Sequence, residues 1–269
     1  MVGYYSFTIP ANSDAILYGE IFINWIDSIL NDSFVEEKAI ISTRPAWAYG
    51  GQSEEAEFIS GITFKYHSTE FVISTSKSSS STTVYIYIYA RNNRVSLSWA
   101  RTNYISHNYS SDIILNYLIG QNSDYFIISH YNVNYYHFIV IKVDSPVNPI
   151  DTDLYVSILN SSRGTYNKSF DSEDIINIPV RFTLSTVIND YNSSFLVNYY
   201  NKKTELNNVY VYTPVHGVRG KISNLISLTR SRSTSLGTFY MINGVEYVGL
   251  NSLNDIISYG HTGILLKSY

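Results

Sequence analysis

Few residues in this chain have the types and spacing that chemistry needs. Glu54, Glu55 and Glu57 could supply a general acid and a general base, as polysaccharide hydrolysis requires. Carboxylates this close together in a polar loop are also typical of a solvated surface. The histidines are His67, His107, His130, His137, His216 and His261. No two of them have the sequence spacing of metal ligands with a carboxylate nearby. His130 and His137 flank one expected hairpin, so they are either a pair of ligands brought together by the fold or ordinary polar strand residues.

Other signatures of enzymes are missing from the sequence. The chain contains no cysteine, so it has neither disulfides nor thiolate ligands nor a cysteine nucleophile. It also lacks the nucleophile elbow of serine hydrolases, the phosphate-binding loop and the glycine-rich dinucleotide motif. The sequence therefore shows no motif for a metal or a cofactor, and we expect neither; the cluster Glu54 to Glu57 stays the candidate for acid–base catalysis.

Aromatic residues offer a second kind of site. Trp47, Tyr49 and Trp99 could stack against sugar rings, with asparagine and glutamine side chains as hydrogen-bonding partners. Such a platform needs aromatic rings that face the solvent. The sequence therefore keeps a carbohydrate- or receptor-binding module as an alternative function.

Protein contact is the third kind of site. Tyr85, Tyr87 and Tyr89 alternate with aliphatic residues, so all three share one face of a strand, which we expect to point outward. Tyrosine gives rigid contact area at low entropic cost. Four of the 18 basic residues form the one concentration of positive charge in the chain, and these are Arg219, Lys221, Arg230 and Arg232. This stretch is either a contact for an acidic neighbour or a charged strand edge that discourages aggregation.

The overall composition narrows the class of protein. The 269 residues carry a net charge of −4 from 18 basic and 22 acidic residues, which argues against nucleic-acid binding. Charged residues make up only 15% of the chain, and 26 tyrosines take much of their place. A surface so poor in charge is weakly protected against self-association. No apolar run is long enough for a membrane span and no secretory signal is visible, so we expect neither a membrane nor secretion.

The elements that would position these residues are mainly strands. One helix is predicted over 15–30, because apolar residues from Leu17 to Leu30 recur at helical spacing after the start signal Asn12-Ser13-Asp14. A hairpin is predicted from strands 84–90 and 95–100, and a meander from strands 113–119, 125–130 and 135–143. Asn243-Gly244 predicts a tight turn between strands 238–242 and 245–250.

These elements predict a mainly β fold of antiparallel hairpins, a sandwich-like unit with one N-terminal helix packed on it. We expect one β-rich unit over residues 1–269. The proline-bearing stretch 145–151 is the place at which two lobes, 1–144 and 152–269, would divide. The serine-rich stretch 76–83 is expected to be an exposed loop.

The order of these elements resembles that of the virion structural proteins of tailed bacteriophages. The resemblance rests on an N-terminal helix, an acidic residue before a small-residue turn, a strand pair with an Asn-Ser turn, and a glycine-rich C-terminal strand pair. The matching segments are 15–30, 57–61, 117–143 with Gln121, Asn122 and Ser123 at the turn, and 217–269 with Gly220, Lys221 and Asn243-Gly244. Residues 151–214 depart from the pattern.

The resemblance implies a non-enzymatic structural component of a virion, made in the host cytoplasm. Such a component is present in several copies in the tail, neck (collar) or baseplate, and its partners are copies of itself and other virion proteins. It implies no catalytic residues. The alternatives are a carbohydrate- or receptor-binding module, a hydrolase that uses Glu54 to Glu57, and a β-rich protein unrelated to phage.

Overall fold

The chain folds into two compact units. The computed structural model describes residues 2–48, 56–67, 69–78, 83–91, 96–106, 111–131, 136–146, 155–161, 164–170, 181–184, 205–213, 217–229, 237–250 and 261–268. The helix unit comprises Tyr4–Phe138 and Leu159–Tyr166, and the C-terminal unit comprises Met1–Gly3, Ile139–Ile158 and Asn167–Tyr269. A division into lobes at residues 145–151 stays a prediction.

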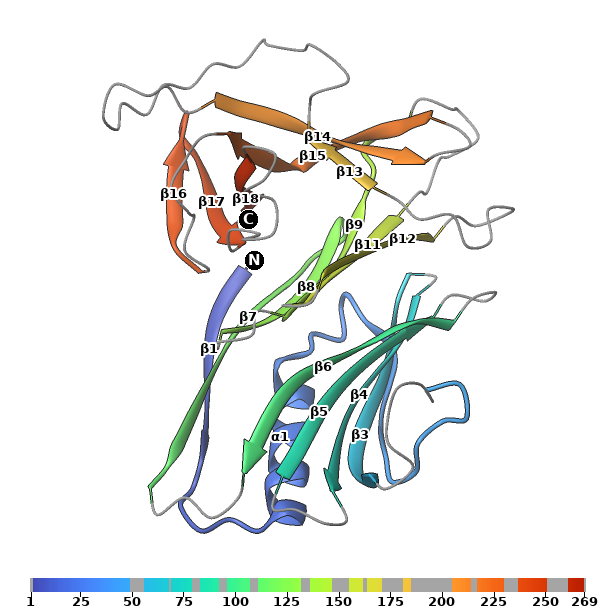
Figure 1. Cartoon of the computed structure of the whole chain (residues 1–269), viewed down its shortest axis with the longest axis vertical. Helices are drawn as coiled ribbons and strands as arrows, with labels where there is room; N and C mark the ends of the chain where they lie inside the picture. Colours follow the sequence, from blue (N-terminus) through green and yellow to red (C-terminus); the bar gives the residue numbers. More distant parts are fainter. Residues whose placement is uncertain are drawn as a thin grey trace. The chain divides into compact units, whose positions relative to one another are not determined.

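The regular elements among the described residues are strands and one helix (Figure 1). In chain order these are β1 (Val2–Ile9), α1 (Ala15–Ile29), β2 (Glu36–Ile41), β3 (Ala56–Tyr66), β4 (Thr69–Ser78), β5 (Thr83–Arg91), β6 (Ser96–Ser106), β7 (Ile113–Gln121), β8 (Tyr125–Tyr131), β9 (Tyr136–Lys142), β10 (Ser145–Pro146), β11 (Tyr155–Ser161), β12 (Gly164–Phe170), β13 (Arg181–Leu184), β14 (Glu205–Thr213), β15 (Gly217–Thr229), β16 (Phe239–Ile242), β17 (Val245–Leu250) and β18 (His261–Lys267). The prediction of a mainly β protein with one N-terminal helix is confirmed.

The strands form three sheets. Sheet A has the order β1-β7-β8-β9-β11-β12, and sheet B the order β2-β3-β4-β5-β6. Sheet C has the order β13-β14-β15-β18-β17-β16, with β10 paired to β15 off this path. Neighbours along the chain pair antiparallel throughout sheet B, as hairpin connections require.

Helix α1 starts where the sequence predicts. Asp14 is the N-cap, and its carboxylate accepts a hydrogen bond of 2.8 Å from the backbone N–H of Leu17. The buried face runs through Tyr18, Phe22 and Ile26, one helical turn apart. Leu17, which the periodicity places with the apolar face, is exposed instead.

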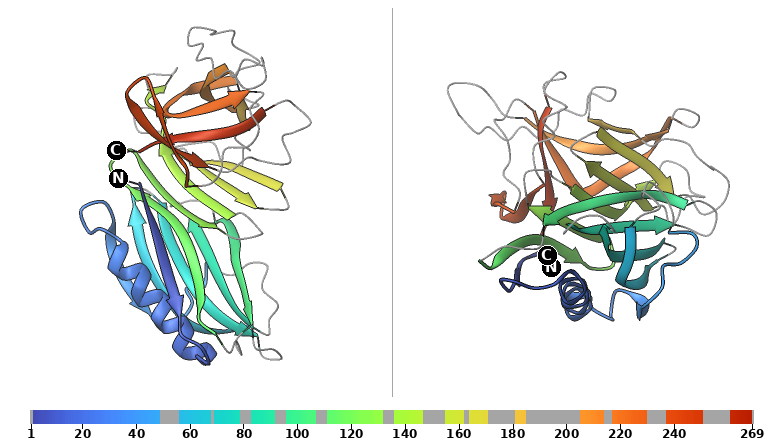
Figure 2. Two further views of the ribbon diagram at one scale, coloured as in Figure 1. Left: turned by 90° about the vertical axis from the view of Figure 1, so that its left-hand side faces the viewer. Right: turned by 60° about the horizontal axis from the view of Figure 1, so that its bottom comes forward.

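The helix packs on two sheets of the helix unit. Its residues contact β3 and β4 of sheet B, and Figure 2 shows it running beside β1 of sheet A. On that side the ring of Phe22 lies 5.5 Å from Phe7 of β1 and 5.7 Å from Tyr117 of β7, measured between centroids. Aromatic residues also join the two sheets directly, since Phe126 of β8 lies 5.4 Å from Phe64 of β3. Within the helix unit, this shared core joins α1 to β1 and β7 of sheet A and to β3 and β4 of sheet B, and it joins β8 to β3.

The C-terminal unit contains the predicted tight hairpin. Ile242 pairs with Val245, and the two residues between them, Asn243 and Gly244, both have positive φ. A two-residue turn of this kind matches the twist of the flanking strands. The long strand β15 pairs with β14 on one side and with β18 on the other.

Candidate functional site

The tyrosine row of β5 does not face the solvent. Tyr87 and Tyr89 are each only 3% exposed, and Tyr85 is half-buried. The alternation is as predicted, because Ile86 and Ile88 occupy the opposite face of the strand. The expectation of an outward tyrosine surface is wrong for Tyr87 and Tyr89, because both faces of β5 are covered.

Residues 41–48 provide that cover, and we name them the strap. Ala48 is fully buried against Tyr87, Tyr89 and Val72, with Ile41, Trp47 and Tyr85 packed around them. The tyrosine rings lose water where the strap covers their face of β5, and this burial favours the closed arrangement. The row is therefore part of the core of the helix unit.

Two arginines hold the strap against the sheet. The guanidinium of Arg91 lies 4.4 Å from the centroid of the Trp47 ring, and its Nε donates to Glu70 at 2.8 Å. Arg44 of the strap lies 5.7 Å from the centroid of the Phe58 ring and donates to the Ser76 hydroxyl at 2.9 Å. Ser76, predicted to open an exposed loop, is buried at the end of β4.

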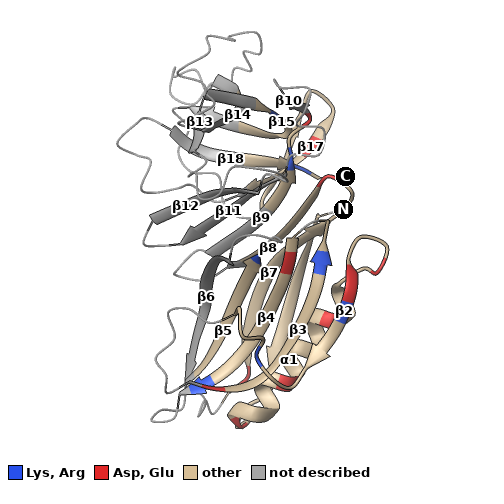
Figure 3. Ribbon diagram, turned by 90° about the vertical axis from the view of Figure 1, so that its right-hand side faces the viewer, with Lys and Arg blue, Asp and Glu red and all other residues tan. Residues whose placement is uncertain are grey.

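Charged residues of β3 to β5 lie toward the ends of these strands (Figure 3). Lys65 pairs with Glu37 of β2, and Glu70 pairs with Arg91 at the same end of the sheet. At the other end Lys77 lies 2.9 Å from Glu57. Glu57, a candidate acid or base in the sequence, thus has a cationic partner on the next strand. Glu54 and Glu55 lie outside the described residues.

Of the three predicted sugar-stacking residues, the structure describes the side chain of Trp47 and only the backbone of Trp99. Trp99 of β6 is the register partner of Tyr89, beside which Trp47 packs. One face of the Trp47 ring is engaged by Arg91, and the residue packs against the tyrosine row. Tyr49 lies outside the described residues. The described arrangement therefore makes Trp47 a packing residue of the strap rather than an open stacking platform.

The basic stretch is divided by the structure. Arg219 and Lys221 lie on β15, and Arg230 and Arg232 lie outside the described residues. Lys221 pairs with Ser145 of β10, and its carbonyl accepts from the backbone N–H of Asp144. The Asp144 carboxylate accepts from the backbone N–H of Ser223. Asp144 thus ties β10 to β15 through backbone groups of the basic stretch.

Whether His130 and His137 form a ligand pair is not tested by the described side chains, so this alternative stays a prediction. His130 lies on β8 opposite Tyr117, and His137 lies on β9; their side chains lie outside the described residues. Among the residues that the structure describes, no three histidine or acidic side chains come together as metal ligands would.

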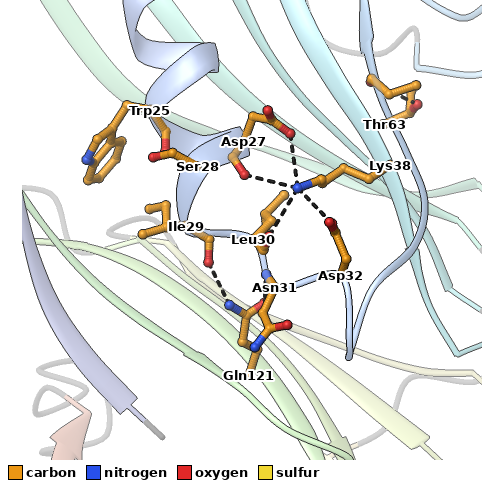
Figure 4. A network of polar contacts seen from close by, with 11 residues as sticks. Trp25, Asp27, Ser28, Ile29, Leu30, Asn31, Asp32, Lys38, Thr63 and Gln121 are labelled. Atoms are coloured by element: carbon orange, nitrogen blue, oxygen red, sulfur yellow. Dashed lines mark hydrogen bonds and ion pairs between the residues drawn. The ribbon is translucent and has the colours of Figure 1, made fainter.

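A polar network at the end of α1 was not predicted from the sequence (Figure 4). Lys38 of β2 donates to the carbonyls of Asp27 and Leu30 at 3.1 Å each, and it forms ion pairs with the carboxylates of Asp27 and Asp32. A cation at this position satisfies backbone carbonyls that the helix itself leaves unpaired. The hydrogen bond from Lys38 to Asp32 raises the pKa of the lysine, and the interactions with Asp27 add to that effect against desolvation.

Gln121 completes this network from the other sheet. Its side-chain amide donates to the carbonyl of Ile29 at 2.7 Å and accepts from the N–H of Asn31 at 3.1 Å. The end of α1 is therefore fixed to sheet B by Lys38 and to sheet A by Gln121. The sequence indicated only that Gln121, Asn122 and Ser123 form a turn. It did not indicate that Gln121 contacts the helix, because the two segments lie far apart in the sequence.

The charge on Lys38 makes the stability of this network pH-dependent. We expect Lys38→Met to lower the free energy of unfolding at pH 7 by about 1–2 kcal/mol. Because the folded state raises the pKa of this lysine, its contribution is complete below the unfolded pKa of about 10.4 and is lost as pH rises through the folded value. Urea unfolding of both proteins between pH 7 and pH 11 tests this, and a difference that stays constant up to pH 11 would contradict it.

Large apolar side chains are exposed on the outer strand of each sheet. Sheet A ends with β1, sheet B with β2 and sheet C with β16. The exposed residues on these strands are Tyr4, Ile40, Phe239 and Met241. Outer strands carry unpaired backbone N–H and C=O groups and are usually protected by charge, proline or short length. We take these three edges as candidate surfaces for contact with another chain; β1 and β16 carry no charged residue, whereas β2 also carries Glu36, Glu37 and Lys38.

Comparison with known proteins gives no relative on which to base a function. No family model matches the chain, no curated protein is significantly similar in sequence, and no solved structure is significantly similar in fold. Within the described residues, α1 is too short to cross a membrane.

Proposed function

We propose that this chain is a non-enzymatic structural component of a tailed-bacteriophage particle. It joins copies of itself and neighbouring virion proteins in the tail, neck or baseplate. The single observation that carries the proposal is the exposure of large apolar side chains on the outer strands β1, β2 and β16. The resemblance in element order supplies the phage particle as the setting.

The physical argument is that an apolar sheet edge is unfavourable in water and favourable in contact with another strand. A partner strand at such an edge gains main-chain hydrogen bonds, and apolar side chains at alternate positions add burial. The low charged fraction of the chain, 15%, leaves few residues to oppose such contacts. Assembly in several copies would cover these edges.

We propose that the chain contacts its neighbours through sheet edges and not, as the sequence predicts, through the tyrosine row of β5. Tyr87 and Tyr89 are covered by the strap, so they support the fold rather than a neighbour. Substitution of these tyrosines would lower stability as well as assembly. The edge residues Ile40 and Met241 are exposed and are therefore the better probes.

The proposal is tested by density-gradient sedimentation of a lysate from the source of this chain. The measurement asks whether the chain sediments with intact particles. We expect the tagged chain to travel with intact particles and to remain with them in high salt, because apolar contacts are not weakened by screening. The double variant Ile40→Lys with Met241→Lys should be depleted from the particle fraction at least several-fold.

Ser33→Lys is the matched control. Ser33 is exposed in the turn after α1, so the substitution adds a positive charge away from any sheet edge. This variant should sediment like the unmodified chain. A chain that remains entirely in the soluble fraction would reject the structural role.

A further inference from the structure

Strand β16 has the features of an edge that pairs with a copy of itself. It is the outer strand of sheet C, with β17 as its neighbour in the described part of the sheet (Figure 1). Phe239 is 45% exposed and Met241 is 66% exposed, whereas Tyr240 and Ile242 pack against Leu265 on the opposite face. The exposed side of this edge is therefore apolar.

The hairpin geometry determines which backbone groups of β16 face outward. In a two-residue hairpin the residues flanking the turn, Ile242 and Val245, form a hydrogen-bonded pair, and such pairs recur at every second position. The hydrogen bond from the N–H of Gly249 to the carbonyl of Thr238 agrees with this phase. The backbone groups of Phe239 and Met241 consequently point away from β17. The two exposed apolar residues are also the two with outward N–H and C=O groups.

We infer that β16 pairs antiparallel with β16 of a second copy of this chain about a two-fold axis at Tyr240. In this register Phe239 of one copy lies opposite Met241 of the other, and all four outward residues of the pair form hydrogen bonds. A register centred on Phe239 or on Met241 would pair only that residue with its own copy. The Tyr240 register also places a thioether beside an aromatic ring on each side of the axis, which is a favourable contact.

The charge pattern of the edge fits a second copy. Residues 237–245 contain no charged side chain, so two identical edges meet without like-charge repulsion. Lysine or proline, the usual protection of an outer strand, is also missing from β16. A two-fold symmetric contact needs a surface that complements itself. The uncharged, largely apolar segment 237–245 meets this requirement.

The pairing deepens the proposed function and rests on it. Two four-residue strands cover less area than the roughly 1,000 Å² of a stable interface, so the isolated pair is weak. In a particle with several copies, the high local concentration favours the same contact. The partner at this edge is thus another copy of the chain held nearby by the assembly.

A single engineered cysteine tests the register, because the natural chain has none. Tyr240 would lie opposite its own copy at a position without hydrogen bonds, where the Cα atoms are about 4.5 Å apart, within disulfide range. We expect the full-length Tyr240→Cys chain, oxidised with glutathione disulfide, to run mainly as a covalent dimer. In Thr238→Cys the equivalent Cα atoms would be about 14 Å apart, so this control should remain monomeric.

A second substitution separates edge pairing from random collision. Adding Met241→Lys to the Tyr240→Cys chain should reduce the dimer at least five-fold, whereas adding Ser33→Lys, in the turn after α1, should leave it unchanged. Circular dichroism verifies that each variant is folded. Equal cross-linking of the Tyr240→Cys and Thr238→Cys chains, or none in either, would overturn the pairing.

The outcome is independent of the test of the proposed function. Failure to cross-link, in a chain that still sediments with particles, would reject this edge contact and leave the virion role supported. Cross-linking of a chain that never enters particles would support the pairing and reject the virion role.

Discussion

Replacing Phe22 with alanine is expected to lower the free energy of unfolding of the helix unit by about 3–5 kcal/mol. Phe22 has no exposed surface and lies between Phe7, Trp25 and Tyr117, at centroid distances of 5.5 to 5.8 Å. Truncation removes these aromatic contacts and leaves a cavity between the helix and sheet A. Such a loss is a large part of the 5–15 kcal/mol that stabilises a typical domain.

Phe34→Ala is the matched control for this prediction. Phe34 lies just beyond α1 and is partly exposed, so the same substitution should cost at most about 1 kcal/mol. Both variants can be compared by guanidinium unfolding followed by far-ultraviolet circular dichroism. Similar midpoints for Phe22→Ala and Phe34→Ala would show that the helix does not join the sheets through Phe22.

Gly19→Val is expected to destabilise the helix unit by about 3 kcal/mol, the upper range for overpacking. A Cβ atom at Gly19 would lie 2.6 Å from the hydroxyl oxygen of Thr75 and 2.7 Å from Cγ2 of Ile59. Both neighbours are β-branched and stiff, so they give way only if the helix moves off sheet B. Glycine at this position therefore allows the close approach of the helix to the sheet.

Glu20→Val separates this effect from helix propensity. Glu20 is the next residue of α1 and is exposed, so valine there should cost less than about 0.7 kcal/mol. Gly19→Ala adds a test of sign, because alanine would stabilise an exposed helix by about 1 kcal/mol but should destabilise this one. Thermal unfolding of the three variants measures the order, and a more stable Gly19→Ala would contradict the close approach.

Local patterns predicted much of the fold. The Asn12-Ser13-Asp14 start signal and the apolar spacing located α1 to within one residue of its end, and Asn243-Gly244 located the C-terminal hairpin. The alternation over 84–90 identified β5 and the composition of its two faces. These features depend on residues a few positions apart, which is the range over which the sequence carries a direct signal.

Patterns that depend on distant partners were predicted less well. Strand β2 carries three charged residues and no clear alternation, so its place at the edge of sheet B depends on pairing with β3. In the sequence, Lys38 resembles an ordinary surface lysine. In the structure, the last carbonyls of α1 lie within hydrogen-bonding distance of its ammonium group. Gln121 resembles an ordinary turn residue in the sequence, although its amide donates to the carbonyl of Ile29 in the helix, 92 positions earlier in the chain.

By itself the sequence determined that the protein is mainly β, which residues share a strand face, and where the helix begins. Only the tertiary structure decided what covers each face: it buried the tyrosine row beneath the strap and left Phe239 and Met241 exposed on an outer strand. The reason is physical, because periodicity follows from backbone geometry, whereas burial depends on which distant segments pack together.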